Sequence, residues 1–506
     1  MCRIETSVIW VKYGSNKLKR RLSWRSSLIL LLSLMMFHAR LVKASFMSRS
    51  LRARTASHID LAAYSSPARR VAIVGGGVAG LSVAYHLLKH QHANVTEKLS
   101  IKTCRPRIQV TIFDQTASPG LGGASAVAGG LLHPFSPRGK IVHLGKEALE
   151  VANQLIHDAS RHSSNVILRH KLYRLATTHE AVKQLQQTAM KFPHLARWMS
   201  PDQIVHILNG GGDNKSTGMG IDFTSVSTTI MGGLELSHGC KVVHLPSYLQ
   251  ALWKECQYLS KLPYQDADSS ENNNVEVQWI QIKKTDTATS SPDFWQQQLH
   301  KFDTIVYAAG SGMFLEENLE TGVVSTTPSS SMFSLQLPIS LVRGQSIELD
   351  LLSSSVEHVQ NQCVNTPAIL CGKYLSPLPQ NGRVLLGATH EHKLMPLSQE
   401  LVKIEIQKRT AQFLPMELWD RGHIHQFTSG WRVQSNRGAH GRLPIIGKLS
   451  PVEHAVPGHD DAWIFTGLSS RGLLYHGLFG KILSHAILSG SEENMKSHFP
   501  EVCWWR

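Results

Sequence analysis

Cysteine is scarce in this chain of 506 residues, and the few cysteines present stand far apart. They are Cys2, Cys104, Cys240, Cys256, Cys363, Cys371 and Cys503. No two of them form a C-x-x-C pair, which argues against a disulfide framework and favours a reducing compartment. The histidines include two close pairs, His390/His392 and His423/His425, but no H-E-x-x-H motif occurs. We therefore expect no metal site.

The sequence also lacks an apolar run long enough to cross a membrane, which requires about 20 residues. The run from Leu28 to Phe37 is too short, and no later segment approaches the required length. We therefore expect no integral membrane span.

Acidic residues are scarce at the start of the chain. The first 70 residues hold 14 of the 52 Lys and Arg residues, but only Glu5 and Asp60 as acids. Most of the net charge of +15 therefore belongs to this leader, and the remaining chain is close to neutral. Because residues 1–66 are rich in Arg, Ser and Lys, we predict a largely disordered transit peptide for an organelle, a chloroplast or a mitochondrion. The alternative is a secretory signal with Leu28 to Phe37 as its apolar region.

The clearest motif follows this leader. The apolar run Val71 to Val74 predicts a buried parallel strand, and Leu81 to Leu88 predicts a helix. Between them Gly75, Gly77 and Gly80 form G-x-G-x-x-G, in which the glycines permit a tight turn, close approach to a pyrophosphate and close helix–strand packing. The helix N-terminus offers N–H groups to the phosphates. This context predicts a dinucleotide-binding site.

A second strand, Ile108 to Phe113, is expected to end at Asp114. An acid at this strand end binds a ribose hydroxyl in dinucleotide folds and disfavours a 2′-phosphate. The separation from the glycines exceeds the usual ~20 residues, and the polar loop from Gln91 to Arg107 accounts for the excess. A merely solvated aspartate is the alternative.

Small residues dominate two further segments. Ser118 to Pro134 is either a flexible linker or backbone lying against a flat ligand, and its Ala, Val and Leu content favours the ligand. Phe302 to Gly312 predicts a buried strand whose small terminal residues leave space at the carboxyl edge of a parallel sheet. Both features extend the predicted site.

The region from 335 to 430 has a different pattern. Alternating strands are separated by turn residues, with Gln380-Asn381-Gly382 as a hairpin signal, and this predicts an antiparallel sheet inserted into a doubly wound α/β domain. Earlier in the chain, Val166 to Thr177 alternates like one strand. The expected fold class is therefore α/β with an inserted, sheet-rich α+β region.

Six segments, in this order, resemble the D-amino-acid-oxidase-like family of FAD-dependent oxidoreductases, which includes glycine and sarcosine oxidases. The resemblance covers about Arg70 to Leu488 and implies a Rossmann-like FAD-binding domain with an inserted antiparallel β-sheet substrate domain. Within a unit of 67–490, it implies FAD-binding parts at about 69–140, 236–260, 300–315 and 430–490, and a substrate domain at about 160–235 and 335–430. The segments are VAIVGGGVAGLSVAYHL (71–87), VTIFDQ (110–115), GASAVAGGLLHPF (123–135), FDTIVYAAGSG (302–312), GWR with GRLPIIG (430–447) and FTGLSSRGLLYHGLFGKIL (465–483).

Within this family, VRGQ (342–345), CGKYLSP (371–377) and LGAT (386–389) are most similar to one branch. That branch is the FAD domain of the bacterial bifunctional enzyme that modifies the tRNA wobble uridine, where it removes a carboxymethyl group from a side-chain amine. No methyltransferase domain is evident in this chain, so we expect a single-function relative or an enzyme for another amine.

The resemblance implies specific roles. Arg432 would bind a substrate carboxylate through two parallel hydrogen bonds, Arg471 would be a second substrate-side arginine, and Tyr374 would place a phenol above the substrate. The alternatives are that Arg432 is a structural arginine between the domains and that Tyr374 has a packing role. The residues expected at FAD are Gly75, Gly77, Val78, Ala79, Gly80, Asp114, Ala124, Ser125, Gly129, Gly130, Leu131, Gly310, Gly467, Ser470, Arg471, Gly472 and Leu473.

The implied reaction is oxidation of the C–N bond of a secondary amine or amino acid, with hydride transfer to FAD. We expect non-covalent FAD, because His133 near the flavin loop does not match the histidyl attachment motif. The partners considered are a small amine or amino acid, or a modified tRNA, and the oligomeric state stays open. A glycine- or sarcosine-type oxidase and a non-catalytic FAD-binding assembly factor are the alternatives.

Overall fold

The chain divides into two units, Met1–Ser65 and Ser66–Arg506, and the description below concerns the second. The predicted leader of residues 1–66 lies outside the described residues. The computed structural model describes residues 68–92, 107–209, 224–262, 277–282, 292–317, 324–325, 336–351, 366–380, 382–451, 453 and 459–506.

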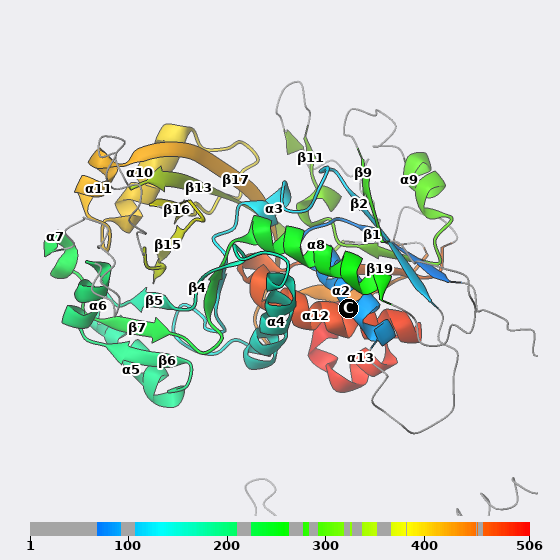
Figure 1. The fold of residues 1–506 in the computed structure, drawn as a ribbon, viewed down its shortest axis with the longest axis horizontal. Coiled ribbons are helices and arrows are strands. Elements are labelled where there is room, and N and C mark those ends of the chain that lie inside the picture. Colours follow the sequence, from blue (N-terminus) through cyan, green and yellow to red (C-terminus); the bar gives the residue numbers. More distant parts are fainter. Residues whose placement is uncertain are drawn as a thin grey trace, which may run out of the picture. The chain divides into compact units, whose positions relative to one another are not determined.

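A six-stranded sheet forms one half of this unit (Figure 1), with the order β18-β19-β10-β1-β2-β9. Its neighbours pair in parallel except β18, which runs antiparallel to β19. The strands are short apolar runs, as expected of a sheet covered on both faces. They are β1 (Arg69–Val74), β2 (Ile108–Asp114), β9 (Gln278–Gln281), β10 (Thr304–Tyr307), β18 (Ile445–Leu449) and β19 (Ala462–Thr466). The predicted strands at 71–74 and 108–113 are confirmed. The strand predicted at 302–312 is confirmed only over Thr304–Tyr307, because Gly310–Met313 forms a 3-10 helix.

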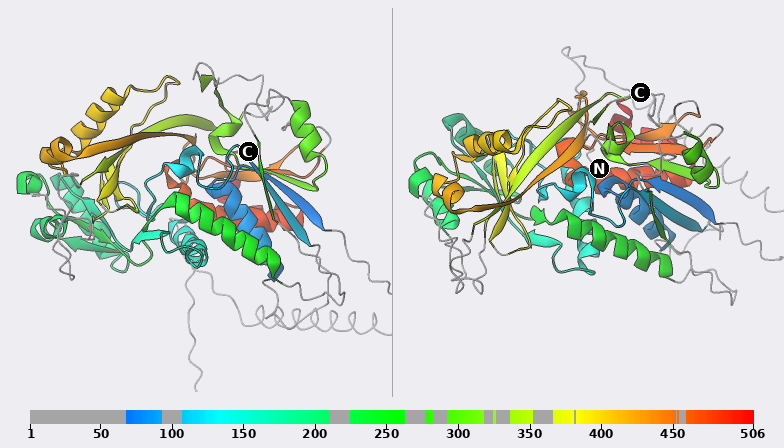
Figure 2. Two further views of the ribbon diagram at one scale, coloured as in Figure 1. Left: turned by 45° about the horizontal axis from the view of Figure 1, so that its top comes forward. Right: turned by 90° about the horizontal axis from the view of Figure 1, so that it is seen from above.

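Four helices pack into one buried layer over this sheet (Figure 2). The helix of this layer nearest the C-terminus is buried along most of its length, with Lys481 and His485 exposed, which fits a central place in the layer. The opposite face is covered by α9 (Pro292–Leu299) and by Trp504 and Trp505 at the C-terminus. The layer consists of α2 (Val78–His92), α4 (Gly145–Ser160), α8 (Leu245–Lys261) and α12 (Gly472–Ser489). After α12 come α13 (Glu493–His498) and η6 (Pro500–Cys503).

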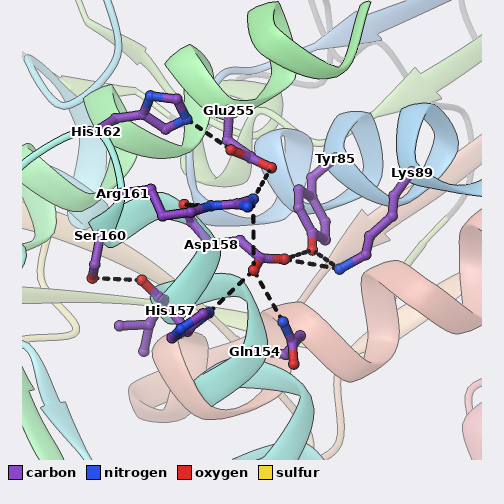
Figure 3. A network of polar contacts seen from close by, with 10 residues as sticks. Tyr85, Lys89, Gln154, His157, Asp158, Ser160, Arg161, His162 and Glu255 are labelled. Carbon is purple, nitrogen blue, oxygen red and sulfur yellow. Dashed lines mark hydrogen bonds and ion pairs between the residues drawn. The ribbon is translucent and has the colours of Figure 1, made fainter. Parts of the chain in front are cut away.

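A polar network around two buried carboxylates lies between α2, α4 and α8 (Figure 3). Asp158 accepts hydrogen bonds from Tyr85 Oη at 2.5 Å, Lys89 Nζ at 2.8 Å and Gln154 Nε2 at 3.0 Å. Burial alone would raise the pKa of Asp158, but these donors lower it below its ordinary value. A second carboxylate in the network, Glu255, receives Arg161 Nη2 at 2.6 Å and His162 Nε2 at 2.7 Å. The helices are therefore joined by paired charges as well as by apolar packing.

An eight-stranded sheet forms the other half, with the order β17-β13-β16-β15-β14-β5-β7-β6. It combines two distant chain segments, and the pair β14–β5 is parallel whereas every other pair is antiparallel. The predicted antiparallel sheet is therefore confirmed except at that pair, where the two segments meet without a hairpin. The strands are β5 (Leu172–Leu175), β6 (Ala196–Met199), β7 (Gly233–Leu236), β13 (Ile339–Asp350), β14 (Ile369–Cys371), β15 (Lys373–Pro377), β16 (Arg383–Gly387) and β17 (His423–Ser435).

Five helices accompany this sheet, namely α5 (His179–Lys191), α6 (Pro201–Leu208), α7 (Thr224–Ser227), α10 (Gln399–Thr410) and α11 (Met416–Arg421). The expected turn at Gln380–Gly382 joins the antiparallel strands β15 and β16, although Asn381 lies outside the described residues. The boundary expected near residue 430 falls inside β17, so Arg432 belongs to the eight-stranded sheet.

Two smaller sheets, β3-β8-β4 and β11-β12, accompany the larger ones, and the first of them corrects one prediction. The segment Val166 to Thr177 is not one strand, because the chain bends at the exposed His170. Its first half, β4, pairs with β8, whereas its second half, β5, joins the eight-stranded sheet. The remaining short elements are β3 (Leu131–Leu132), β4 (Ile167–Arg169), β8 (Lys241–Val243), β11 (Glu316–Glu317), β12 (Val324–Ser325), α3 (Gly123–Ala126), η2 (Gly310–Met313) and η5 (Ser469–Arg471). No helix within the described ranges is long and apolar enough to cross a membrane.

Candidate active site

A cavity of about 2020 Å³ extends from the strand ends of the parallel sheet to the eight-stranded sheet. It reaches Val74 at the end of β1, Asp114 at the end of β2, Ala308 after β10 and Thr466 at the end of β19. These are the carboxyl ends of parallel strands, where α/β sheets bind ligands. Small-molecule sites usually measure roughly 300–1,000 Å³, so this cavity has space for a dinucleotide together with a second ligand.

The three motif glycines have different surroundings. A Cβ on Gly75 would lie 2.4 Å from the Ala309 Cα, and Gly75 has a φ of +108°. A Cβ on Gly80 would lie 1.9 Å from the Gly75 carbonyl oxygen. A Cβ on Gly77, by contrast, would meet only Ser125 Oγ at 3.3 Å and would otherwise enter the cavity. Gly75 and Gly80 are therefore packing positions, and Gly77 leaves open the space in which a pyrophosphate would lie at the N-terminus of α2.

Asp114 lies at the cavity wall but already accepts three hydrogen bonds. Its Oδ2 receives Gly76 N at 2.7 Å, and its Oδ1 receives Thr116 N at 2.8 Å and Thr116 Oγ1 at 2.6 Å. A carboxylate offers about four acceptor positions, so one remains for a ribose hydroxyl. Trp279 supports the residues around Asp114, because its indole contacts Gly76 and its Nε1 donates to Thr116 O at 2.9 Å. Asp114 thus shapes the glycine turn as well as facing the cavity.

The small-residue segment forms a second wall. Ala124, Ser125, Gly129, Gly130 and Leu131 all line the cavity. A Cβ on Gly129 would lie 2.6 Å from the ring of Tyr374, and Ser376 Oγ donates to Gly129 O at 2.6 Å. The segment is therefore backbone held closely against the eight-stranded sheet.

The third wall is the turn into α12. Gly467, Ser470, Arg471, Gly472 and Leu473 line the cavity there, opposite Gly310, whose Cβ position is open. Every residue predicted to hold FAD lines the cavity except Gly80, which is covered by the Gly75 carbonyl and contributes through packing alone. The glycine-lined openings and the α2 N-terminus fit a flat dinucleotide.

The eight-stranded sheet supplies the wall on which a substrate would lie. Ser346, Gly387, Tyr374, Leu370 and Arg174 are in register across β13, β16, β15, β14 and β5, and all line the cavity. Burial raises the pKa of the Tyr374 phenol, which lies 3.2 Å from Ser346 Oγ. The row therefore places a neutral phenol in the middle of this wall.

Arg432 lies on β17 beside this row, four residues beyond Thr428, which is the register partner of Ser346. Its Nη2 passes over Gly344 and donates to Thr389 O at 3.5 Å. Burial lowers the pKa of Arg432, and the nearby Tyr374 opposes that shift. A guanidinium held in the wall by one long hydrogen bond retains donors for a ligand.

Arg174, Arg471 and His133 form a second basic group on the cavity wall. Arg174 is only 8% exposed and donates Nη1–H to Ser136 O. Burial lowers the pKa of Arg174 to about 10, with a further contribution from Arg471. Burial, together with the charges of these two arginines, lowers the pKa of His133 well below its ordinary value. The histidine is therefore neutral.

The cavity wall is strongly basic. Among the described residues that line it, Asp114 is the one carboxylate, whereas the Arg and Lys residues are Arg174, Arg343, Lys373, Arg409, Arg432 and Arg471. Lys373 and Arg409 share Glu405, at 3.5 and 2.9 Å. Within the described part of the chain, no carboxylate contributes to the charge environment of Arg174, Arg432 or Arg471. The wall is suited to an anionic ligand.

Sequence reasoning placed Arg432, Arg471 and Tyr374 at the site, and the structure brings all three to this cavity. The sequence patterns alone did not identify Arg174 or Trp279 as residues of the site. An arginine in the otherwise apolar Leu172–Leu175 was the available signal for Arg174, because a charge at an inward strand position is unusual. No cluster of His, Cys, Asp and Glu side chains able to hold a metal occurs in the ranges described.

These features define a dinucleotide-binding α/β protein with a separate sheet for substrate. A family model described as FAD dependent oxidoreductase matches residues 70–486, so the chain belongs to this family, the DAO family, and is an FAD-dependent oxidoreductase. FAD is therefore the cofactor, and the glycine-lined walls leave space for it.

Three solved structures share the fold. The chain is similar to glycine oxidase from Geobacillus kaustophilus, with 17% identity, a TM-score of 0.53, and coverage of 84% of this chain and 96% of that one. It is similar to iminodiacetate oxidase from Chelativorans sp. BNC1, with 15% identity, a TM-score of 0.51, and coverage of 83% and 96%. Fructosyl amine:oxygen oxidoreductase from Aspergillus fumigatus has 12% identity, a TM-score of 0.54, and coverage of 87% and 90%. No curated protein sequence matches the chain.

Proposed function

We propose that this oxidoreductase oxidises the C–N bond of a secondary amine or amino acid whose carboxylate binds Arg432. The observation that carries the proposal is the half-buried Arg432 guanidinium, which lines the cavity without a carboxylate partner among the described residues. Burying a cation without a counter-charge costs free energy, so a ligand carboxylate is the natural partner. The names of the three similar structures, which denote glycine, iminodiacetate and fructosyl amine oxidation, agree with this substrate class.

In the proposed reaction, the residues of the cavity wall bind and position the substrate for hydride transfer to FAD. Arg432 would bind the carboxylate through two parallel hydrogen bonds and thereby fix the adjacent carbon. Tyr374, whose ring lies against Gly129, would cover part of the wall near the bound carboxylate. When bound between the glycine walls, FAD would supply the acceptor for the hydride. The amine must be neutral to release that hydride, and the basic wall favours the neutral amine.

A carboxymethylaminomethyl group on a tRNA wobble uridine is the first candidate substrate. The three segments that resemble the tRNA-modifying branch all contribute to the cavity wall, through Arg343, Gln345, Lys373, Tyr374 and Thr389 among others. Free glycine or sarcosine is the alternative. A non-catalytic FAD-binding assembly factor is less well supported, because such a protein does not require Arg432.

The test uses the purified full chain. Its absorbance spectrum should show bound flavin, and that spectrum should bleach without oxygen on addition of the substrate. Glycine, sarcosine, tRNA bearing carboxymethylaminomethyluridine and the same tRNA without it are compared. Bleaching by the modified tRNA alone supports the first candidate, and bleaching by sarcosine alone supports the alternative. A flavin-loaded chain that no amine bleaches would contradict the proposal.

A further inference from the structure

The cavity has a second basic end, which the binding of one carboxylate at Arg432 does not use. From Gly387, two residues before the Thr389 carbonyl that accepts from Arg432, the register passes through Tyr374 and Leu370 to Arg174. Neighbouring strands lie about 4.8 Å apart, so the backbone at Arg174 is about 14 Å from that at Gly387. The two basic ends are therefore separate positions on one wall.

Arg174 is more than nine-tenths buried and lines the cavity. Among the described residues, the Ser136 carbonyl oxygen accepts from its Nη1, whereas a guanidinium has five N–H donors. The hydrogen bond to Ser136 uses one donor of Arg174. The positive charge of Arg174 has no carboxylate partner among the described residues. A structural tether alone does not require a buried cation there.

His133 supplies a neutral donor at the same end. Its Nδ1 accepts the Phe135 N–H at 3.2 Å, so the proton of the neutral ring is on Nε2. Arg471, on the wall beside it, adds a second positive charge. Two guanidinium groups and an imidazole N–H, with no acid among the described lining residues at this end, form an environment suited to an oxyanion.

The lining also continues past Arg174 along the start of α5. Leu175, Thr177, Ala181 and Gln184 belong to the wall, and Ala181 and Gln184 are partly exposed. The cavity therefore extends from Arg174 toward the protein surface, which gives space for a substrate longer than glycine.

We infer that Arg174, with His133 and Arg471, binds a second oxyanionic group of the substrate, a carboxylate or a phosphate. This inference rests on the proposed function and refines it. The substrate would be an amine with one carboxylate at Arg432 and a second anionic group at the far end of its other arm.

The test compares matched amines with the full-length protein. N-(ω-carboxyalkyl)glycines of increasing chain length are paired with N-alkylglycines of equal length, and N-(ω-phosphonooxyalkyl)glycines distinguish phosphate from carboxylate. The rate of anaerobic flavin bleaching gives kcat and KM. We expect KM to be about ten- to a hundredfold lower for the dianionic member at the best chain length, because a hydrogen-bonded ion pair is gained. Equal KM values for the pairs in the unaltered protein would overturn the inference.

Variants of Arg174 then test whether the preference for the dianionic amine depends on this residue. Arg174→Gln should abolish the preference for the dianionic amine and leave KM for the N-alkylglycine within about twofold, whereas Arg174→Lys should retain part of it. Arg169→Gln is the matched control, because Arg169 also donates to backbone carbonyls, at Thr366 and Leu168, but does not line the cavity. A preference that survives in Arg174→Gln would contradict the inference, as would one lost equally in Arg169→Gln.

Equilibrium binding separates this inference from the proposed function. Adipate and hexanoate are titrated into the flavin-loaded protein, and the dissociation constants are read from the flavin absorbance and from the rise in Tm. Adipate should bind at least tenfold more tightly than hexanoate, and Arg174→Gln should remove that difference. If no amine is oxidised but this pattern holds, the proposed reaction fails and the anion site stands. If amines are oxidised without it, the reaction stands and the second site fails.

Discussion

Two groups of buried charges differ in how they are partnered. Between α2, α4 and α8, the carboxylates of Asp158 and Glu255 each receive several donors (Figure 3). On the cavity wall, Arg174, Arg432 and Arg471 have no carboxylate partner among the described residues. A paired buried charge joins elements of the fold, whereas an unpaired one is costly until a ligand binds. Partnering, rather than burial, therefore separates structural from functional charges in this protein.

The largest expected effect follows from removing a cavity charge. Arg432→Gln should reduce kcat/KM for a carboxylate-bearing amine about a thousandfold, equivalent to about 4 kcal/mol, because the ion pair with substrate is lost. The Tm without substrate should stay equal or rise, since an unpaired buried cation is removed. Stopped-flow flavin reduction and thermal unfolding measure the two quantities. An amine without a carboxylate is the control and should lose far less rate.

The opposite result is expected in the helix layer. Asp158→Asn should lower the free energy of unfolding by about 2–3 kcal/mol, because the charged acceptor for Tyr85 and Lys89 is lost. Flavin reduction by the folded protein should be unchanged. Urea unfolding at neutral pH, with equal FAD in both samples, provides the measurement. If Asp158→Asn kept its stability but lost activity, the distinction between structural paired charges and functional unpaired charges would be wrong.

Much of the cofactor side was predictable because its signals are local in the chain. The glycine turn, Asp114 and the small-residue segment each combine a strand end with the residues that follow it. The motif also predicted the close packing at Gly80, which lies against the Gly75 carbonyl and not at the cavity.

The substrate wall was harder to predict because distant pairing builds it. Arg174 reaches the row through the parallel pair β14–β5, which joins segments almost 200 residues apart and has no hairpin signal. Strand β17 has little apolar alternation, and its pairing with β13 along nearly its whole length stabilises it. Arg432 was identified through family resemblance, whereas Arg174 has no comparable motif.

Acid should affect the helix layer through His476. This fully buried ring lies 2.7 Å from Tyr248 Oη and 2.9 Å from Leu473 O, and burial lowers its pKa to about 4. Below the ordinary value of about 6.5, the unfolded chain binds a proton that the folded chain does not, so stability falls as the pH decreases from 6.5 to 4. The expected slope is about 1.4 kcal/mol per pH unit for this group.

The variant His476→Gln tests that assignment. It should be less stable at pH 7, where a hydrogen bond is weakened, but its stability should fall less steeply between pH 6.5 and 4. Chemical unfolding across this range gives both slopes, and other buried histidines such as His86 contribute equally to the two proteins. An unchanged slope would show that His476 does not hold its proton as the structure indicates.

The smallest effect should come from the exposed edge of the network. Lys89 is 43% exposed, and Asp158 retains Tyr85 and Gln154 as donors when the lysine is removed. We expect Lys89→Gln to cost at most about 1 kcal/mol, because an ion pair with an exposed partner is screened by water. The lysine lowers the pKa of Asp158, so its contribution is present above the ordinary pKa of an aspartate and is lost as the pH falls below it. The difference in unfolding free energy between Lys89→Gln and the unaltered protein should therefore shrink on acidification below about pH 4. A loss at neutral pH as large as that of Asp158→Asn would mean that the charge pair, and not the set of donors around the buried carboxylate, stabilises the helix layer.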